Sequence, residues 1–186
     1  MSKILVIGAH VDDESFGMLG TLIKHKEAGD TLFFLWFTEA RETELGRHKL
    51  LDFFNPTLSN VRYFQDQQLD AYPIKRFITV IEEFINEIKP DVVYTNFIGD
   101  LNKDHRLVSE ATMVACRPYK EHAPKEVWMY RIPGSTELGL REFKPDRTEL
   151  IDSSKKLELL LKWYPDELIN GREVVDEYER FERWPR

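Results

Sequence analysis

The chain has 186 residues, of which 42% are hydrophobic and 32% charged, and its formal net charge is −7. This length and apolar content predict one folded domain with a sizeable core and exclude a disordered chain. The negative charge argues against a nucleic-acid surface, which needs clustered Lys and Arg. No apolar run reaches the roughly 18 residues of a membrane span, so no membrane partner is expected.

The apolar segment at residues 3–9 is short and soon followed by acids, which is not the pattern of a secretory signal. Cys116 is the only cysteine, so no internal disulfide can form, and we expect it inside a helix core. These features indicate a soluble protein of a reducing cytoplasm.

Apolar runs alternate with segments of helical periodicity along the chain. In chain order we expect strand 3–9, helix 14–28, strand 31–38, helix 42–54, strand 61–64, helix 74–89, strand 91–95, helix 104–117, strand 126–132 and helix 153–164. The last twenty residues are charged and carry no clear period. The alternation predicts an α/β fold with a parallel sheet covered on both faces. Ligands bind such sheets beyond the carboxyl ends of the strands, here loops 9–14 and 96–105 with 38–47 as a third wall.

The first of these loops carries His10, Asp12, Asp13 and Glu14. Acids in the first turn of a helix interact favourably with its dipole, which explains Asp13 and Glu14 without any chemistry. That explanation leaves the histidine and the second adjacent carboxylate without a role.

The second loop repeats the combination with Asp100, Asn102, Asp104 and His105. Asp104 alone could cap the following helix. Together, however, the two loops can supply two imidazoles and a carboxylate to one cation, the ligand set of a catalytic zinc or iron site. The remaining carboxylate could then act as general base for a water whose pKa the metal lowers.

Other chemistries find less support. His25, His48 and His122 lie among polar neighbours and are expected at the surface. Neither G-x-G-x-x-G nor a P-loop motif is present. The segment "GSTELG" lacks the G-x-S-x-G spacing of a serine hydrolase.

Two motifs resemble the signatures of a known family. "AHVDDE" (9–14) resembles the AHPDDE motif of the LmbE-like, or PIG-L, N-deacetylases, and "GDLNKDHRLVSEA" (99–111) resembles their second motif. The likeness is strongest over residues 3–137 of a single domain spanning 1–186, and residues 150–186 diverge. It implies a single-domain Rossmann-like three-layer sandwich with a mostly parallel sheet.

The resemblance also implies a site. His10, Asp13 and His105 would bind one divalent metal, Zn²⁺ or another such as Fe²⁺. Asp12 would be the general base, and Asp104 would orient a neighbouring group. The substrate would be a small N-acetylated amino sugar, similar to N-acetylglucosamine, and members of the family often form trimers or hexamers.

Two departures from the family pattern concern the site, and one family contact has two candidate residues here. Asn102 stands where some members carry a histidine; its amide can donate to an oxyanion but cannot transfer a proton. An arginine of the third loop often contacts substrate, and Arg41 and Arg47 both qualify. The His-Pro-Arg segment that usually lines the pocket near the C-terminus is not found.

These observations favour a zinc-dependent hydrolase that removes an acetyl group from an N-acetylated amino sugar or its conjugate. One alternative is a metal hydrolase of another small amide or an ester. Another is a non-catalytic sugar- or nucleotide-binding relative. A phosphate-accepting signalling domain would explain the acids but not His10 or His105.

Overall fold

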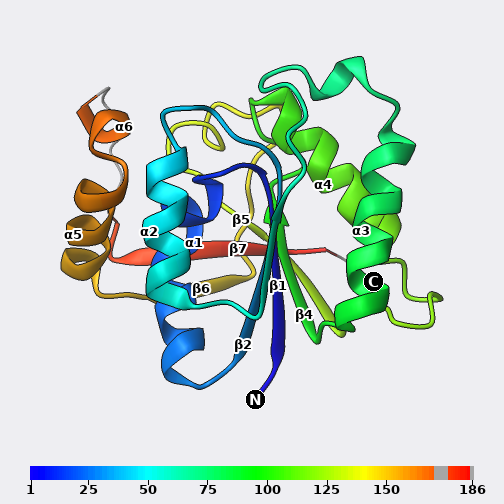
Figure 1. Cartoon of the computed structure of the whole chain (residues 1–186), viewed down its shortest axis with the longest axis horizontal. Coiled ribbons are helices and arrows are strands. Elements are labelled where there is room, and N and C mark those ends of the chain that lie inside the picture. The colour runs from blue at the N-terminus through cyan, green and yellow to red at the C-terminus, as the bar shows by residue number, and fades with distance from the viewer. Residues whose placement is uncertain (170–175, 185–186) are drawn as a thin grey trace.

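The computed structural model describes residues 1–169 and 176–184, and its strands form one seven-stranded sheet between two layers of helices (Figure 1). The strands are β1 Lys3–His10, β2 Thr31–Thr38, β3 Leu58–Val61, β4 Val92–Asn96, β5 Glu126–Tyr130, β6 Arg147–Leu150 and β7 Tyr178–Arg183. The helices are α1 Asp13–Glu27, α2 Glu44–Phe54, α3 Ile74–Ile88, α4 Lys103–Ala115, α5 Ser153–Trp163 and α6 Pro165–Ile169, with a 3-10 turn at Leu69–Ala71.

The strand order is β3-β2-β1-β4-β5-β7-β6, and the first five of these strands are parallel. The connections run one way from β1 to β2 and β3, and the other way from β4 onward. The order therefore reverses between β1 and β4, and the loops after these strands diverge to leave a crevice. β7 pairs antiparallel with both β5 and β6 and completes the sheet.

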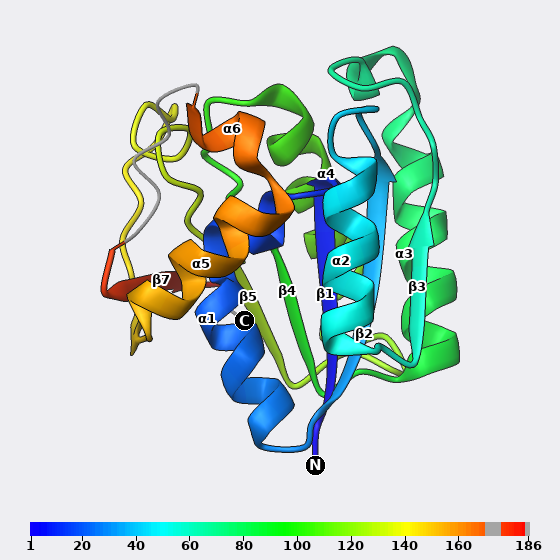
Figure 2. The ribbon, with the colours of Figure 1, turned by 60° about the vertical axis from the view of Figure 1, so that its left-hand side comes forward.

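Buried side chains fill both faces of the sheet, as the uninterrupted apolar strands require. Along β1, Ile4 and Val6 belong to the core beneath α1, α2 and α5, whereas Leu5 and Ile7 belong to the core beneath α3 and α4. Figures 1 and 2 show these two groups of helices on opposite faces of the sheet. The predicted three-layer α/β fold is confirmed.

The sequence-based boundaries agree closely with the structure over most of the chain, including β2 at 31–38. The strand predicted at 61–64 was misplaced, because β3 occupies Leu58–Val61. β6 and β7 were not predicted, since their sequences "RTEL" and "YERFER" are largely charged.

Two further predictions concern single residues. Cys116 is buried, as expected for a helix core. The prediction of a surface position for His25 is wrong: its ring lies 2.8 Å from Asp30 and 3.1 Å from the Tyr94 hydroxyl, with the side chain 16% exposed. No helix within the described ranges is both long and apolar enough to cross a bilayer.

Candidate metal centre and active site

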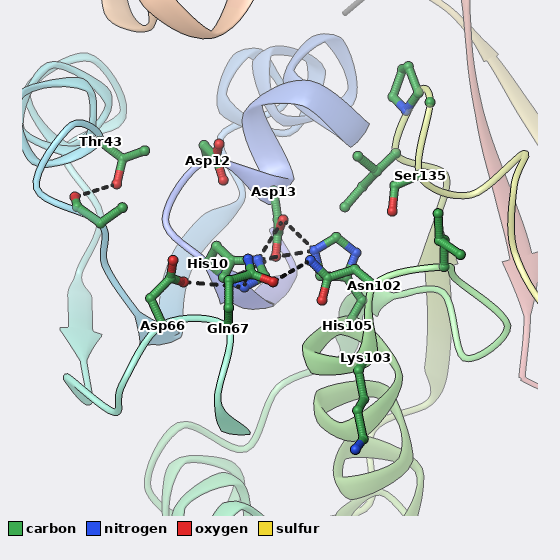
Figure 3. A pocket seen from close by; sticks show the side chains of 15 residues that line it. His10, Asp12, Asp13, Thr43, Asp66, Gln67, Asn102, Lys103, His105 and Ser135 are labelled. Atoms are coloured by element: carbon green, nitrogen blue, oxygen red, sulfur yellow. Dashed lines mark hydrogen bonds and ion pairs between the residues drawn. The ribbon is translucent and has the colours of Figure 1, made fainter. Parts of the chain in front are cut away.

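A pocket of about 630 Å³ opens at the carboxyl edge of the sheet, where the strand order reverses. Its lining residues come from the segments that follow β1, β2, β3, β4 and β5, and Figure 3 shows their side chains converging on it. Its lining comprises His10, Asp12, Asp13, Ala40, Thr43, Asp66, Gln67, Leu101, Asn102, Lys103, His105, Ile132, Pro133, Gly134 and Ser135. The two acid–histidine loops predicted from the sequence thus meet in one cavity.

The loop after β1 is held in a tight turn by its own backbone. The Asp12 amide donates to the His10 carbonyl, and the Asp12 carbonyl accepts from the amides of Ser15 and Phe16 at the start of α1. Asp12 has φ 155° and ψ −20°, a conformation that a residue with a Cβ rarely adopts. Such a conformation costs about 1–3 kcal/mol and is most often found at functional sites.

The two carboxylate oxygens of Asp13 have different partners. Oδ2 accepts from the backbone amide of His10 and from the side-chain amide of Asn96, each at 2.9 Å. Asn96 is itself fixed, because its Oδ1 accepts from the Ala9 amide. Oδ1 is left to face the imidazoles of His10 and His105. The hydrogen bonds thereby orient Asp13 to offer a single oxygen to the pocket.

The three side chains match the donor set of a divalent metal. Asp13 Oδ1 lies 3.1 Å from His105 Nε2 and 3.6 Å from His10 Nδ1, and the two imidazole nitrogens are 3.1 Å apart. Ligand atoms of a tetrahedral zinc ion lie about 3.3 Å from one another. The residues therefore fit a zinc-like ion with three protein ligands and an open position.

The far nitrogen of His105 is fixed by a buried carboxylate. Asp100 Oδ1 lies 3.0 Å from His105 Nδ1, and Asp100 is fully buried. The same carboxylate accepts from the backbone amide of Asn102 and from the hydroxyls of Ser135 and Thr136. When the imidazole is neutral and Nδ1 carries the proton toward Asp100, the lone pair of Nε2 points at the candidate metal position.

His10 has a corresponding arrangement on its other face. Its Nε2 lies 3.4 Å from Asp104 Oδ2, 3.5 Å from Asp66 Oδ1 and 3.3 Å from the side-chain amide of Gln67. His10, Asp66 and Asp104 could themselves hold a cation. A neutral imidazole that binds metal through Nδ1 keeps its proton on Nε2, however, and these carboxylates are then its acceptors.

The imidazoles of His10 and His105 and the carboxylates beside them shift one another's pKa values. Burial lowers the pKa of His105, but the Asp13 charge and the Asp100 hydrogen bond outweigh this and raise the pKa to about 9. The pKa of His10 is raised in the same way by Asp13 and Asp104 against its burial. Burial would raise the pKa of Asp13, yet the charges of His105 and His10 hold it well below its usual value. The site is thus built to keep Asp13 ionised and to attract positive charge.

Asp12 and Asn102 stand on opposite loops of the pocket (Figure 3). Asn102 is the N-cap of α4, where its Oδ1 accepts from the Asp104 amide at 2.9 Å. This bond fixes the orientation of the side chain, so its NH₂ group faces Gln67 and the pocket. The Asn102 amide can therefore act as a hydrogen-bond donor toward a bound molecule.

Other predicted positions have different surroundings. Arg41 is exposed, and the Arg47 guanidinium is bonded to Glu39; neither lines the pocket. Glu14 points away from the site into the core, where it accepts from Trp36 Nε1 at 2.6 Å and Ser15 Oγ at 2.9 Å. Burial raises its pKa to about 7 despite these two bonds.

Sequence reasoning missed three residues that shape the site: Gln67, Asn96 and Asp100 as a support of His105. Asn96 ends β4 and Asp100 lies in the second loop, so their positions at the carboxyl edge of the sheet were visible in the sequence. The partners of these residues could not be predicted, because a contact such as that of Asn96 with Asp13 joins residues 83 positions apart in the sequence. Gln67 follows Asp66 in a turn with φ 56°, and no sequence signal indicates its direction.

The chain matches the family model PIG-L, described as GlcNAc-PI de-N-acetylase, over residues 5–116. This match covers more than half of the sequence and includes both acid–histidine loops. The protein belongs to the PIG-L family of de-N-acetylases.

Solved structures show the same fold. N,N'-diacetylchitobiose deacetylase from Pyrococcus horikoshii has a TM-score of 0.75 at 16% identity, covering 99% of this chain and 84% of that one. The conserved protein TT1542 from Thermus thermophilus has a TM-score of 0.74 at 19% identity, covering 97% and 94%. GalB, a 4-carboxy-2-hydroxymuconate hydratase from Pseudomonas putida, has a TM-score of 0.70 at 17% identity, covering 100% and 98%.

Proposed function

We propose that this protein is a metal-dependent N-deacetylase that releases acetate from a small N-acetylated amino sugar or sugar conjugate. The observation that carries the proposal is the meeting of His10 Nδ1, Asp13 Oδ1 and His105 Nε2 within 3.1–3.6 Å on a pocket that Asp12 and Asn102 also line. Membership of the PIG-L family and the likeness to a diacetylchitobiose deacetylase support the same activity.

His10, Asp13 and His105 would hold the ion, zinc being the best match to two imidazoles and a carboxylate. A bound ion would polarise the amide carbonyl and lower the pKa of water at the site. Asp12 would take a proton from the attacking water and return it to the departing amine. The Asn102 NH₂ would donate to the oxyanion that forms on the carbonyl oxygen.

Asp104 and Asp100 would hold the two imidazoles in the tautomers that leave their lone pairs toward the ion. Of the two candidate arginines, we assign the substrate contact to Arg41. It follows the pocket-lining Ala40 and is exposed, whereas Arg47 is engaged by Glu39.

The test is product analysis with N-acetylglucosamine and its β-glycosides, using protein reconstituted with Zn²⁺. We expect equimolar acetate and free amine, and loss of both products with His105→Ala. The hydratase of the same fold shows that the fold alone does not fix the reaction. Failure of the zinc-loaded protein to release acetate from any of these substrates, while it hydrates a 2-hydroxymuconate, would overturn the proposal.

A further inference from the structure

A buried ion pair lies behind the metal-binding loop, outside the candidate active site. Lys156 of α5 and Glu179 of β7 approach to 2.8 Å, with side chains only 4% and 2% exposed. Burying two charges is costly, and a pair of apolar residues in such a place is often at least as stabilising. The position of this pair therefore calls for an explanation beyond stability.

The pair sits at a break in α1. Met18 has φ −149° and ψ 22°, so the first turn, which carries Asp13, is set apart from the rest of the helix. A regular helix would direct the Gly20 amide to the Phe16 carbonyl. Here Gly20 donates to Glu179 Oε1 at 2.9 Å, and the Phe16 carbonyl accepts from Lys156 Nζ at 2.8 Å.

Glu179 also acts as a cap for the second part of α1. Its Oε2 accepts from both the amide and the hydroxyl of Thr21, each at 2.7 Å. The carboxylate thus binds three donors of one helix turn in addition to Lys156. Two apolar side chains could fill the same volume but could not supply partners for these backbone groups.

The first turn of α1 is also pressed against the sheet. A Cβ at Gly17 would lie 2.6 Å from the Tyr130 ring, so the turn approaches β5 as closely as glycine allows. Between this contact and the Asp12 turn lie only four residues, Asp13 among them. A change in the direction of this turn would therefore move Asp13 relative to His105.

We infer that Lys156 and Glu179 are positioning residues that hold the broken helix α1 in the direction that presents Asp13, and with it Asp12, to the metal site. The inference rests on the proposed metal site. The segment after residue 150 lacks a recognisable family motif, and through Lys156 and Glu179 it would help to build that site.

The test is the Zn²⁺ affinity of the double variant Lys156→Met, Glu179→Met, measured by competition with a chromophoric chelator. Removing both charges together avoids leaving one of them buried alone. We expect the zinc dissociation constant to rise about tenfold or more, as for other residues that support metal ligands. At saturating zinc we expect kcat to fall more than KM rises, because Asp12 lies on the same turn.

The matched control is Lys155→Met, Glu158→Met, an exposed pair of the same residue types on the same helix. It should bind zinc as the wild type does, within about twofold. Glu179→Asp provides a second measurement, since it keeps the charge but is too short to reach all of its donors. It should weaken zinc binding in a protein that still folds.

Wild-type zinc affinity in Glu179→Asp, or in a cooperatively folded double variant, would overturn the inference and leave the pair as a purely structural contact. If the double variant does not fold, Glu179→Asp decides alone. If the wild type does not deacetylate N-acetylglucosamine or its β-glycosides but the variants still bind zinc more weakly than the wild type, the proposed reaction is wrong and the positioning role stands.

Discussion

Replacing Asp100 with asparagine should weaken metal binding without removing any metal ligand. The carboxylate accepts the Nδ1 proton of His105 at 3.0 Å, together with Asn102 N at 2.9 Å, Thr136 Oγ1 at 2.7 Å and the Ser135 hydroxyl. Asparagine keeps the shape but loses the charge, and its NH₂ must face donors. We expect zinc affinity to fall about 10- to 100-fold, or about 1.4–2.7 kcal/mol.

Stability should fall as well, since a hydrogen bond to a buried charged group contributes about 1.5–3 kcal/mol. Chelator competition measures the zinc affinity, and thermal unfolding of the chelator-treated protein measures stability separately. Ser135→Ala is a milder comparison, because it removes one donor and leaves the His105 contact. A folded Asp100→Asn protein with wild-type zinc affinity would refute the view that Asp100 fixes the His105 tautomer.

Asp12→Asn should lower kcat by about 10²–10⁴-fold while the zinc content stays at the wild-type value, and turnover near normal in zinc-loaded protein would exclude Asp12 as the base. Arg41→Ala should raise KM with little change in kcat, whereas a KM change confined to Arg47→Ala would reverse the assignment. Zinc at 100 times its dissociation constant should raise the unfolding free energy by about 2.7 kcal/mol, a gain that a chelator removes and that His105→Ala should not show. Folding raises the pKa of Glu14 from 4.5 to about 7. Between these two pH values the folded protein keeps a proton that the unfolded chain has released. The contribution of Glu14 to the free energy of unfolding therefore falls as the pH rises from 4.5 to 7. In chelator-treated protein, Glu14→Gln should therefore be more stable than wild type above pH 7, by an amount on the order of 3 kcal/mol. Equal pH dependence of the unfolding free energy in the two proteins would contradict the raised pKa of Glu14.

The sequence predicts the central sheet well because its strands are buried on both faces. In β1 and β2 nearly every position is apolar, so a strand is visible without any knowledge of its neighbours. β7 is different, because its inward-facing positions include Glu179 beside Phe181. A buried acid whose partner is Lys156 conceals the apolar alternation from which a strand is normally recognised.

In the candidate site, too, some residues could be predicted from the sequence and others could not. His10, Asp13 and His105 could be placed together because parallel strands end at one edge of a sheet, and this edge was evident from the apolar runs. The supporting contacts of Asn96 with Asp13 and of Glu179 with α1 span 83 and 159 residues. Such pairs depend on how the layers pack, which local periodicity does not encode.

The contact between Glu179 and α1 also has a consequence for biosynthesis. The turn that carries Asp13 leaves the ribosome before the carboxylate that caps Gly20 and Thr21, which follows about 160 positions later. At 5–20 residues per second, the nascent helix waits roughly 10–30 s for this partner. A nascent chain stalled before Tyr178 would carry both acid–histidine loops and yet lack Glu179, the residue that we infer orients one of them.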